Sequence, residues 1–363
     1  MKKVLSLVGA RPQFIKEAVV NEAVRKVDAW EHVLVNSGQH YDFNMAGTFL
    51  DELNIPVPKY NMGVGSGTHA EQTADAMRKF EKILLQEKPD LVLLYGDTNT
   101  TLAGAITAVK FNIPIAHVEA GPRTYIKSIP EEVNRVLTDK ISDYLFCATQ
   151  LNVDNLKKEG VIKGVFNTGD VMYDLYLKNE NSFNANGLLT HYKLSENGYI
   201  LVTLHRNFNT DVKEVLQHIL EGLNYATDKY KLQVIFPMHL RAKKNIYDFG
   251  FNHLIQKMII TEPLGYFELM SLLQKCKFVI TDSGGVQKEA YWANKRALLV
   301  VPGGWPEIYS TGWHILLEDP LAISWEEEIN NVLCQHFYPS NILGDGDASN
   351  KIVKIISENL ARR

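Results

Sequence analysis

The sequence of 363 residues predicts an α/β protein made of two doubly wound, Rossmann-like domains that face each other across a cleft. Short, continuous apolar runs alternate with amphipathic segments, which is typical of parallel strands covered on both faces by helices. This alternation occurs twice, on either side of a polar stretch at 179–197 that is rich in Asn, Ser and Gly and is expected to be a loop or an insertion near a domain boundary. The length also suits two domains of common size.

The first half contains five apolar runs that we expect to be β-strands. They lie at 4–8, 32–36, 91–95, 115–118 and 144–148. The expected helices are the amphipathic segments at 13–27, 68–87, 100–111 and 131–141. The run at 91–95 shows the pattern clearly, because the turn sequences Lys-Pro-Asp and Gly-Asp precede and follow it.

The second half repeats this rhythm. The expected strands lie at 199–203, 232–237, 278–281 and 297–301, and the expected helices at 211–227, 267–275 and 286–294. A last helix at 348–360 is expected to pack back on the first domain. We therefore predict one domain at 1–167, a second at 168–345, and a returning segment at 346–363.

The composition favours a cytoplasmic protein with a small-molecule ligand. A net charge of -4 gives no indication of a nucleic-acid or membrane partner. The three cysteines are isolated, so neither a disulfide framework nor a Cys-based zinc site is expected. The N-terminal apolar run of about five residues is too short for a signal peptide, and no stretch approaches the roughly 20 apolar residues of a membrane helix.

Ligands of doubly wound sheets bind beyond the carboxyl ends of the strands, and several unusual sequences fall there. They are GARP at 9–12, GQH at 38–40, GDT at 96–98, HVEAG at 117–121, HR at 205–206 and DSGG at 282–285. The DSGG sequence opens a helix, so its N–H groups can bind a phosphate, although a plain turn capped by Ser283 has the same pattern. Glu289, further along that helix, can accept hydrogen bonds from ribose hydroxyls or be an ordinary solvated residue.

Three acids and two cations of the first domain are candidates for chemistry. Asp97 and Glu119 lie within two residues of the end of a buried strand, and Glu131 begins a helix. Carboxylates that are close together or desolvated acquire raised pKa values and exchange protons near neutral pH, whereas helix capping is the alternative for Asp97 and Glu131. Arg11 and Lys16 flank the start of the first helix and can converge on one anion, although Lys16 can also be an exposed helix residue.

His205 and Arg206 end the first strand of the second domain, where a histidine can act as an acid, a base or a phosphate ligand. Further histidines near strand ends, at 40, 117 and 239, raise the question of a metal site. The sequence has no HxH or HExxH spacing, so we expect no catalytic metal.

In their order, these motifs resemble the non-hydrolysing UDP-N-acetylglucosamine 2-epimerases. The matching stretches are GARPQFIK at 9–16, SGQH at 37–40, GDTNTT at 96–101, HVEAG at 117–121, PEEVNR at 130–135, TGD at 168–170, TLHR at 203–206, DSGGVQKEA at 282–290 and GDGDAS at 344–349. The resemblance covers essentially the whole chain. It implies a glycosyltransferase-B-like fold with the nucleotide between the domains, a homodimer, and a reaction that needs no cofactor.

The reaction implied by the resemblance is an anti elimination of UDP from a UDP-N-acetylhexosamine, followed by its readdition to a bound 2-acetamidoglucal. Carried over by motif, Asp97, Glu119 and Glu131 correspond to the acid–base set, and His205 to the histidine that assists the departing diphosphate. The residues that correspond to the nucleotide-binding set are Arg11, Lys16, Ser283, Gly284, Gly285 and Glu289. Gln39, Arg135 and Arg206 correspond to further substrate-binding positions.

The sequence also departs from the family pattern. TLHRREN becomes TLHRNFN, and TERPE becomes Gly303-Gly304-Trp305-Pro306-Glu307, where Trp305 can shape the sugar pocket or pack in the core. Several stretches, among them SGGVQKEAYW, are more similar to the branch that acts on UDP-2,3-diacetamido-2,3-dideoxyglucuronate. Three alternatives therefore stay open: a 2-epimerase of that sugar, a hydrolysing epimerase that releases N-acetylmannosamine and UDP, and a glycosyltransferase of the same fold. The activity expected first serves polysaccharide precursor synthesis.

Overall fold

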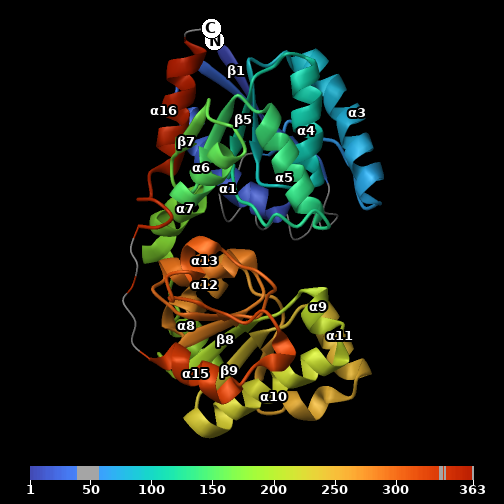
Figure 1. Cartoon of the computed structure of the whole chain (residues 1–363). Coiled ribbons are helices and arrows are strands. Elements are labelled where there is room, and N and C mark those ends of the chain that lie inside the picture. Colours follow the sequence, from blue (N-terminus) through green and yellow to red (C-terminus); the bar gives the residue numbers. More distant parts are fainter. Residues whose placement is uncertain (39–56, 335–337, 339–340, 362–363) are drawn as a thin grey trace. The chain divides into compact units, whose positions relative to one another are not determined.

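The computed structural model describes residues 1–38, 57–334, 338 and 341–361, and Figure 1 shows their course through the chain. The chain divides into two compact units, Met1–Lys178 with Leu343–Arg363, and Asn179–Ile342. The sequence placed the boundaries at 167 and 345, so the segment at 168–178 lies in the first unit and not in the second. Within the described residues, no helix is long and apolar enough to cross a membrane.

Contacts between distant segments explain where the units divide. The carboxylate of Asp174, in α7 (Val171–Asn179), accepts hydrogen bonds from the N–H groups of Ala348 (3.0 Å) and Ser349 (2.7 Å) at the start of α16 (Ala348–Leu360). Helix α16 in turn packs against α1 (Arg11–Arg25). The returning segment and α7 therefore hold each other in the first unit.

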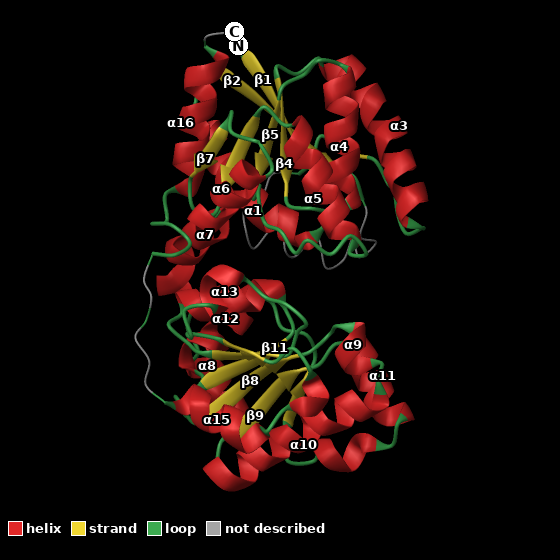
Figure 2. Cartoon of the chain, viewed as in Figure 1, coloured by secondary structure: helices red, strands yellow, loops and turns green. Residues whose placement is uncertain are grey.

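The first unit contains a seven-stranded parallel sheet in the order β3-β2-β1-β4-β5-β6-β7. Its strands are β1 (Lys2–Val8), β2 (Trp30–Asn36), β3 (Tyr60–Asn61), β4 (Leu91–Tyr95), β5 (Ile115–Val118), β6 (Tyr144–Cys147) and β7 (Val165–Asn167). Besides α1, α7 and α16, its described helices are α3 (His69–Glu87), α4 (Asn99–Lys110), α5 (Pro130–Ile141) and α6 (Gln150–Lys158). Figure 2 shows α3, α4 and α5 on one side of the sheet and α16 on the other.

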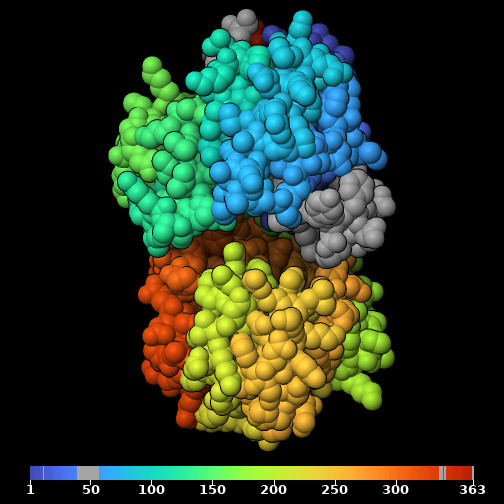
Figure 3. Space-filling view, turned by 90° about the vertical axis from the view of Figure 1, so that its right-hand side faces the viewer, coloured from blue at the N-terminus to red at the C-terminus, as the bar shows by residue number. Residues whose placement is uncertain are grey.

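Helix α3 shows how the apolar pattern directs packing. Its buried positions include Ala76, Phe80, Ile83 and Leu84, which recur at the spacing of one helix face. The exposed residues of α3 include Glu71, Arg78, Glu81 and Lys82, and α3 forms much of the surface of the first unit in the view of Figure 3. The core strands β1 and β4 are almost wholly buried, as expected for a sheet covered on both faces.

The second unit contains a six-stranded parallel sheet in the order β10-β9-β8-β11-β12-β13. Its strands are β8 (Tyr199–Thr203), β9 (Gln233–Pro237), β10 (Ile259–Thr261), β11 (Phe278–Thr281), β12 (Ala297–Leu299) and β13 (Ile315–Leu316). Its α-helices are α8 (Asn186–Tyr192), α9 (Asn207–Thr210), α10 (Lys213–Tyr230), α11 (Leu240–Asp248), α12 (Tyr266–Lys275), α13 (Gly284–Trp292), α14 (Pro306–Tyr309) and α15 (Trp325–Leu333). Two parallel α/β units are the fold class that the sequence predicts.

The expectation of a loop at 179–197 is wrong in part, because α8 lies inside this stretch. The neighbouring Phe183 is buried and packs against Tyr266 and Phe267 of α12, with ring centroids 6.1 and 5.8 Å apart. The contact of Phe183 with α12 explains why a short helix forms here although the local sequence does not predict one.

Gly222 of α10 provides a test of the packing in the second unit. A methyl group at this position would lie 2.1 Å from Cδ2 of Trp325, the first residue of α15. Helix propensity alone predicts that Gly222→Ala gains about 1 kcal/mol. We expect the opposite, a loss of about 1–3 kcal/mol in the free energy of unfolding, because the buried indole must move.

Chemical denaturation followed by circular dichroism measures this effect, and Gly187→Ala is the matched control. Gly187 is also helical and lies in the same unit, but no atom lies within 4 Å of its ideal Cβ position. The control should be stabilised by about 0.5–1 kcal/mol. Equal effects in the two variants would contradict the packing argument.

Candidate active site

A buried amide ties together the loops that follow β1 and β4 in the first unit. Oε1 of Gln13 accepts the N–H groups of Gly9 (2.8 Å) and Ala10 (3.0 Å), and Nε2 donates to the carbonyl of Tyr95 (2.7 Å) and to Oγ1 of Thr101 (2.9 Å). Gln13 is not among the site residues predicted from the sequence. The available indication was a Gln at the third position of a helix that directly follows a strand. A side chain at this position reaches back to the free N–H groups that precede the helix.

Lys16 and Glu119 form an ion pair in this region, and only 8% and 13% of their side-chain surfaces are exposed. The interpretation of Lys16 as an exposed helix residue is therefore wrong. Glu119 has a left-handed backbone with φ of 71°, and the N–H groups of Glu119 and Ala120 both donate to the carbonyl of Phe146 at 3.0 Å. A Cβ atom on Gly96 would lie 3.3 Å from Nζ of Lys16, so the turn after β4 lies against this pair.

Asp97 follows that turn and faces a cation from α5. A nitrogen of the Arg135 guanidinium lies 2.6 Å from Oδ2 of Asp97, and Nδ2 of Asn134 donates to the Asp97 carbonyl at 2.9 Å. Burial raises the pKa of Asp97 above its usual range, the charge of Arg135 opposes this rise, and the charge of Glu119 adds to it. Capping does not explain Asp97, since Thr98 is the residue that caps α4.

Glu131 is exposed in the first turn of α5, and its negative charge also raises the pKa of Asp97. The structure thus brings five predicted residues together at the carboxyl end of the first sheet: Lys16, Asp97, Glu119, Glu131 and Arg135. Gln39 lies outside the described residues, and so does the side chain of Arg11, the first residue of α1.

Glu132, next to Glu131, is buried and organises the loop before α5. Its carboxylate accepts the N–H groups of Thr124 and Tyr125, both at 2.9 Å. In the sequence alone, nothing distinguishes this structural carboxylate from Glu131. The difference follows from the helix geometry, which turns neighbouring side chains to different faces.

In the second unit a buried carboxylate, Asp282, orients the predicted histidine. Nδ1 of His205 lies 2.8 Å from Oδ1 of Asp282, and the N–H groups of His205 and Arg206 also donate to this carboxylate. The His205 side chain remains 41% exposed. The sequence prediction includes Asp282 only as the first residue of the DSGG motif and gives it no role. Its position directly after a buried strand was the available indication that its carboxylate is part of the site.

The predicted phosphate-binding sequence opens α13. Ser283 caps this helix and accepts the N–H of Val286 at 3.4 Å, and Gly284 and Gly285 are the first two helical residues. Glu289 is only 5% exposed, so its interpretation as a solvated helix residue is wrong.

Trp305, in the divergent segment, packs on the same turn. Its indole N–H donates to the carbonyl of Gly284 at 2.9 Å, and Nζ of Lys288 lies 3.6 Å from the centre of a Trp305 ring. Among the described residues, no group of three or more His, Cys, Asp and Glu side chains is arranged to hold a metal ion.

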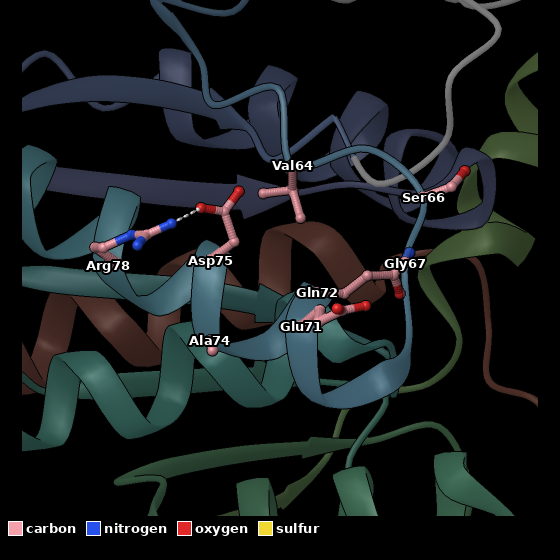
Figure 4. Close-up of a pocket in the computed structure, with 8 residues that line it drawn as sticks. All are labelled: Val64, Ser66, Gly67, Glu71, Gln72, Ala74, Asp75 and Arg78. Atoms are coloured by element: carbon pink, nitrogen blue, oxygen red, sulfur yellow. Dashed lines mark hydrogen bonds and ion pairs between the residues drawn. The ribbon is translucent and has the colours of Figure 1, made fainter.

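An open groove of about 660 Å³ runs along the N-terminal half of α3 in the first unit. Figure 4 shows the residues that line it: Val64, Ser66, Gly67, Glu71, Gln72, Ala74, Asp75 and Arg78. Gln72 connects this groove to the acids, because its Oε1 accepts Nδ2 of Asn99 at 2.9 Å and Oδ1 of Asn99 accepts Nδ2 of Asn134 at 3.2 Å. The side-chain amides of Gln72 and Asn99 thus link the groove to Asn134, which donates to the carbonyl of Asp97.

Comparison with known proteins decides the family. The family model described as UDP-N-acetylglucosamine 2-epimerase matches residues 22–357. A protein of Methanococcus maripaludis named as a homolog of that enzyme is 42% identical, over 98% of this chain and 99% of its own length. The chain belongs to the UDP-N-acetylglucosamine 2-epimerase family. It is therefore an isomerase, as the sequence motifs predict.

Two further similarities bear on the ligand. The crystal structure of the Methanocaldococcus jannaschii UDP-GlcNAc 2-epimerase with UDP-GlcNAc and UDP has a TM-score of 0.87 and 37% identity, and covers 99% of this chain and 100% of that one. The UDP-2,3-diacetamido-2,3-dideoxy-D-glucuronate 2-epimerase of Pseudomonas aeruginosa is 38% identical, over 98% of this chain and 99% of its own length. The whole-chain likeness confirms the predicted two-domain, glycosyltransferase-B-like fold.

Glu17, one residue after Lys16, is a further titratable group in the first unit of this epimerase-family chain. Glu17 is fully buried, and Nε2 of His32 lies 3.4 Å from its Oε1. Burial raises the pKa of Glu17 to about 8, against a smaller opposing effect of the Tyr95 and Ser6 hydroxyls. Burial likewise lowers the pKa of His32 to about 4. This neutral pair is not predicted from the sequence, where Glu17 has the appearance of an ordinary helix residue.

The raised pKa of Glu17 predicts a stability that depends on pH. The unfolded carboxyl ionises near 4.5 and the folded one near 8, so the folded state alone holds the proton in this window. The contribution of Glu17 is therefore fully present below about pH 4.5 and is lost as the pH rises toward 8. Glu17→Gln should gain stability relative to the wild type by about 2–3 kcal/mol between about pH 5 and pH 7.

Denaturation at the two pH values measures this difference. Glu81→Gln, a change at an exposed residue of α3, is the control and should show no such gain. A difference between Glu17→Gln and wild type that does not change with pH would show that the pKa of Glu17 is not raised in the folded protein.

Proposed function

We propose that this chain inverts C2 of a UDP-linked N-acetylhexosamine, of the UDP-GlcNAc to UDP-ManNAc type, without metal or nicotinamide cofactor. The observation that carries the proposal is the gathering of Asp97, Glu119 and Glu131 with Lys16 and Arg135 at one end of the first sheet. The relative from Methanocaldococcus jannaschii, whose structure contains UDP-GlcNAc and UDP, supports the choice of substrate.

The proposed reaction is an elimination followed by a readdition. A carboxylate removes the C2 proton while the bond from C1 to the diphosphate oxygen breaks, and the electron pair of that bond leaves with UDP. The resulting 2-acetamidoglucal is protonated at C2 on its other face, and UDP adds back to C1. The sum is an isomerisation that needs groups able to exchange protons near neutral pH. A raised pKa for Asp97 suits this requirement.

We assign the nucleotide to the second unit and the reacting sugar to the first. In the second unit, the start of α13 provides N–H groups and a favourable dipole for the diphosphate through Ser283, Gly284 and Gly285. His205, oriented by Asp282, assists the departing diphosphate and neutralises its developing charge. Further proposed ligands are Glu289 for the ribose, and Arg11, Gln39 and Arg206 for the anionic substrate.

We further propose that the protein works in the cytoplasm as a homodimer that supplies polysaccharide precursors. An apolar surface on the first unit supports the dimer. Val133 and Leu137 of α5 are 43% and 45% exposed, and Tyr125 and Ile126 in the preceding loop are 62% and 50% exposed. Exposed apolar patches of this kind mark protein interfaces.

A second candidate substrate is UDP-2,3-diacetamido-2,3-dideoxyglucuronate. The 38% identical relative from Pseudomonas aeruginosa that bears this name supports it. The segment Gly303–Trp305 has no charged side chain, and Trp305 is bound to the turn that we assign to the diphosphate. A cation for a C6 carboxylate would then come from another segment, such as Arg206.

Proton NMR in deuterated water tests the proposed reaction. The purified protein, with UDP-GlcNAc and a chelator, should incorporate deuterium at C2 of both epimers, since the removed proton exchanges with solvent before the glycal is protonated again. Epimerisation with full retention of protium at C2 would contradict proton abstraction there. Release of free N-acetylmannosamine would indicate a hydrolysing enzyme, and transfer of the sugar to an added acceptor would indicate a glycosyltransferase. In a parallel sample with UDP-2,3-diacetamido-2,3-dideoxyglucuronate, turnover of that sugar alone would indicate the second candidate substrate.

The ion pair at Asp97 gives a second test of the acid–base assignment. Since the charge of Arg135 lowers the pKa of Asp97, Arg135→Met should raise that pKa further. The acid limb of the pH profile of kcat/KM should move to higher pH, because the ionised carboxylate then forms only at higher pH. Arg78→Met is the control, since Arg78 lies at the same 2.6 Å from Asp75 but is 72% exposed. An unchanged acid limb in Arg135→Met would contradict the role of Asp97.

A further inference from the structure

A chain of four paired ionisable side chains, three of them fully buried, contacts the loops that carry Asp97 and Glu119. The side chains of His117, Asp139 and Arg123 have no exposed surface, and that of Glu159 is 20% exposed. Nδ1 of His117 lies 2.7 Å from Oδ1 of Asp139, Oδ2 of Asp139 lies 2.7 Å from Arg123, and Nε of Arg123 lies 2.7 Å from Glu159. Buried charges are tolerated when each one is paired and hydrogen-bonded.

The inner end of this chain contacts both loops. Nε2 of His117 donates to the carbonyl of Gly96 at 2.7 Å, one peptide bond before Asp97. Oδ2 of Asp139 accepts the N–H of Gly121 at 3.1 Å, two residues after Glu119. A carbonyl can only accept, so Nε2 carries a proton, and the other ring nitrogen faces a carboxylate.

One residue of these loops, Glu119, has a backbone conformation that needs such support. Gly96 and Gly121 have φ of 62° and 88°, which glycine adopts without cost, whereas Glu119 carries a side chain and has φ of 71°. A Cβ atom on Gly121 would lie 2.5 Å from the carbonyl oxygen of Asn152. A left-handed residue with a side chain persists only where surrounding contacts determine its backbone, and the bond from the Gly121 amide to Asp139 is one such contact for the Glu119 loop.

We infer that His117 and Asp139 are positioning residues of the reaction, which hold the Asp97 turn through the Gly96 carbonyl and the Glu119 loop through the Gly121 amide. The inference rests on the proposed function. Neither residue touches the substrate in this assignment. Displacement of either carboxylate by a fraction of an ångström lowers the rate of the chemical step more than it lowers binding.

The outer end of the chain provides a matched control. Asp139→Asn and Glu159→Gln each remove one negative charge from the same chain and conserve side-chain shape. An Asn at 139 has one oxygen and one NH2 group, so it cannot accept from both His117 and Arg123. We expect Asp139→Asn to lower kcat by about tenfold or more, a change of about 1.4 kcal/mol, with KM and the affinity for UDP within about threefold of the wild type. Glu159→Gln, which contacts neither Gly96 nor Gly121, should change kcat by less than about twofold.

A second pair of variants tests the Gly96 contact itself. The side-chain amide of His117→Gln can still donate to the Gly96 carbonyl, whereas His117→Met cannot. We expect the Gln variant to retain at least about threefold more kcat than the Met variant.

The possible results separate this inference from the function on which it rests. No epimerisation by the wild type would overturn the proposed function and this assignment with it. An active wild type with equal kcat in Asp139→Asn and Glu159→Gln, or in the two His117 variants, would overturn the assignment alone. Failure of both Asp139→Asn and His117→Gln to fold would also overturn it, because the chain of charges would then serve stability.

Discussion

The side-chain amide of Gln13 is the contact on which the arrangement of the first site depends. It pairs with two N–H groups at the end of β1 and with a carbonyl at the end of β4. An unpaired buried backbone group costs about 1–3 kcal/mol. Separation of these loops would leave such groups unpaired, so the hydrogen bonds of Gln13 hold the loops together. Lys16 is one turn further along the same helix. The amide that joins the strand ends therefore also fixes where the ammonium group meets Glu119.

Helix α5 approaches the same loops from the other direction. Glu131, Arg135 and Asp139 are spaced by four residues, so they lie along one face of the helix. The first acts on Asp97 by its charge, the second forms the ion pair with Asp97, and the third holds His117 and Gly121. Because a helix is rigid over this length, the three groups keep a constant distance from one another, and the two loops are held to a common support.

Local sequence was sufficient for the sheets and for the position of the candidate site. Continuous apolar strands such as β4 have only one arrangement that buries both faces, and parallel topology then gathers the residues that follow them. Local sequence was not sufficient where a contact joins distant segments. The hydrogen bond between Asp174 and Ser349 joins residues 175 positions apart in the sequence. It places α7 in the first unit, whereas the sequence predicts the boundary before this helix. Asp139 was missed for a related reason, since only the fold places it beneath β5. Its spacing of four from Arg135 was the available signal.

The backbone of Glu119 shows why such support matters for a group that is to exchange protons. A left-handed conformation costs a residue with a side chain roughly 1–2 kcal/mol, and an ion pair to Lys16 alone would not hold it, because that pair weakens whenever the carboxyl is protonated. The two hydrogen bonds from the N–H groups of Glu119 and Ala120 to Phe146 do not depend on the charge of the side chain. Neither does the bond of Gly121 to Asp139. A carboxyl that is positioned by its backbone can gain and lose a proton without leaving its place, which is the property that a two-step proton transfer at one carbon requires.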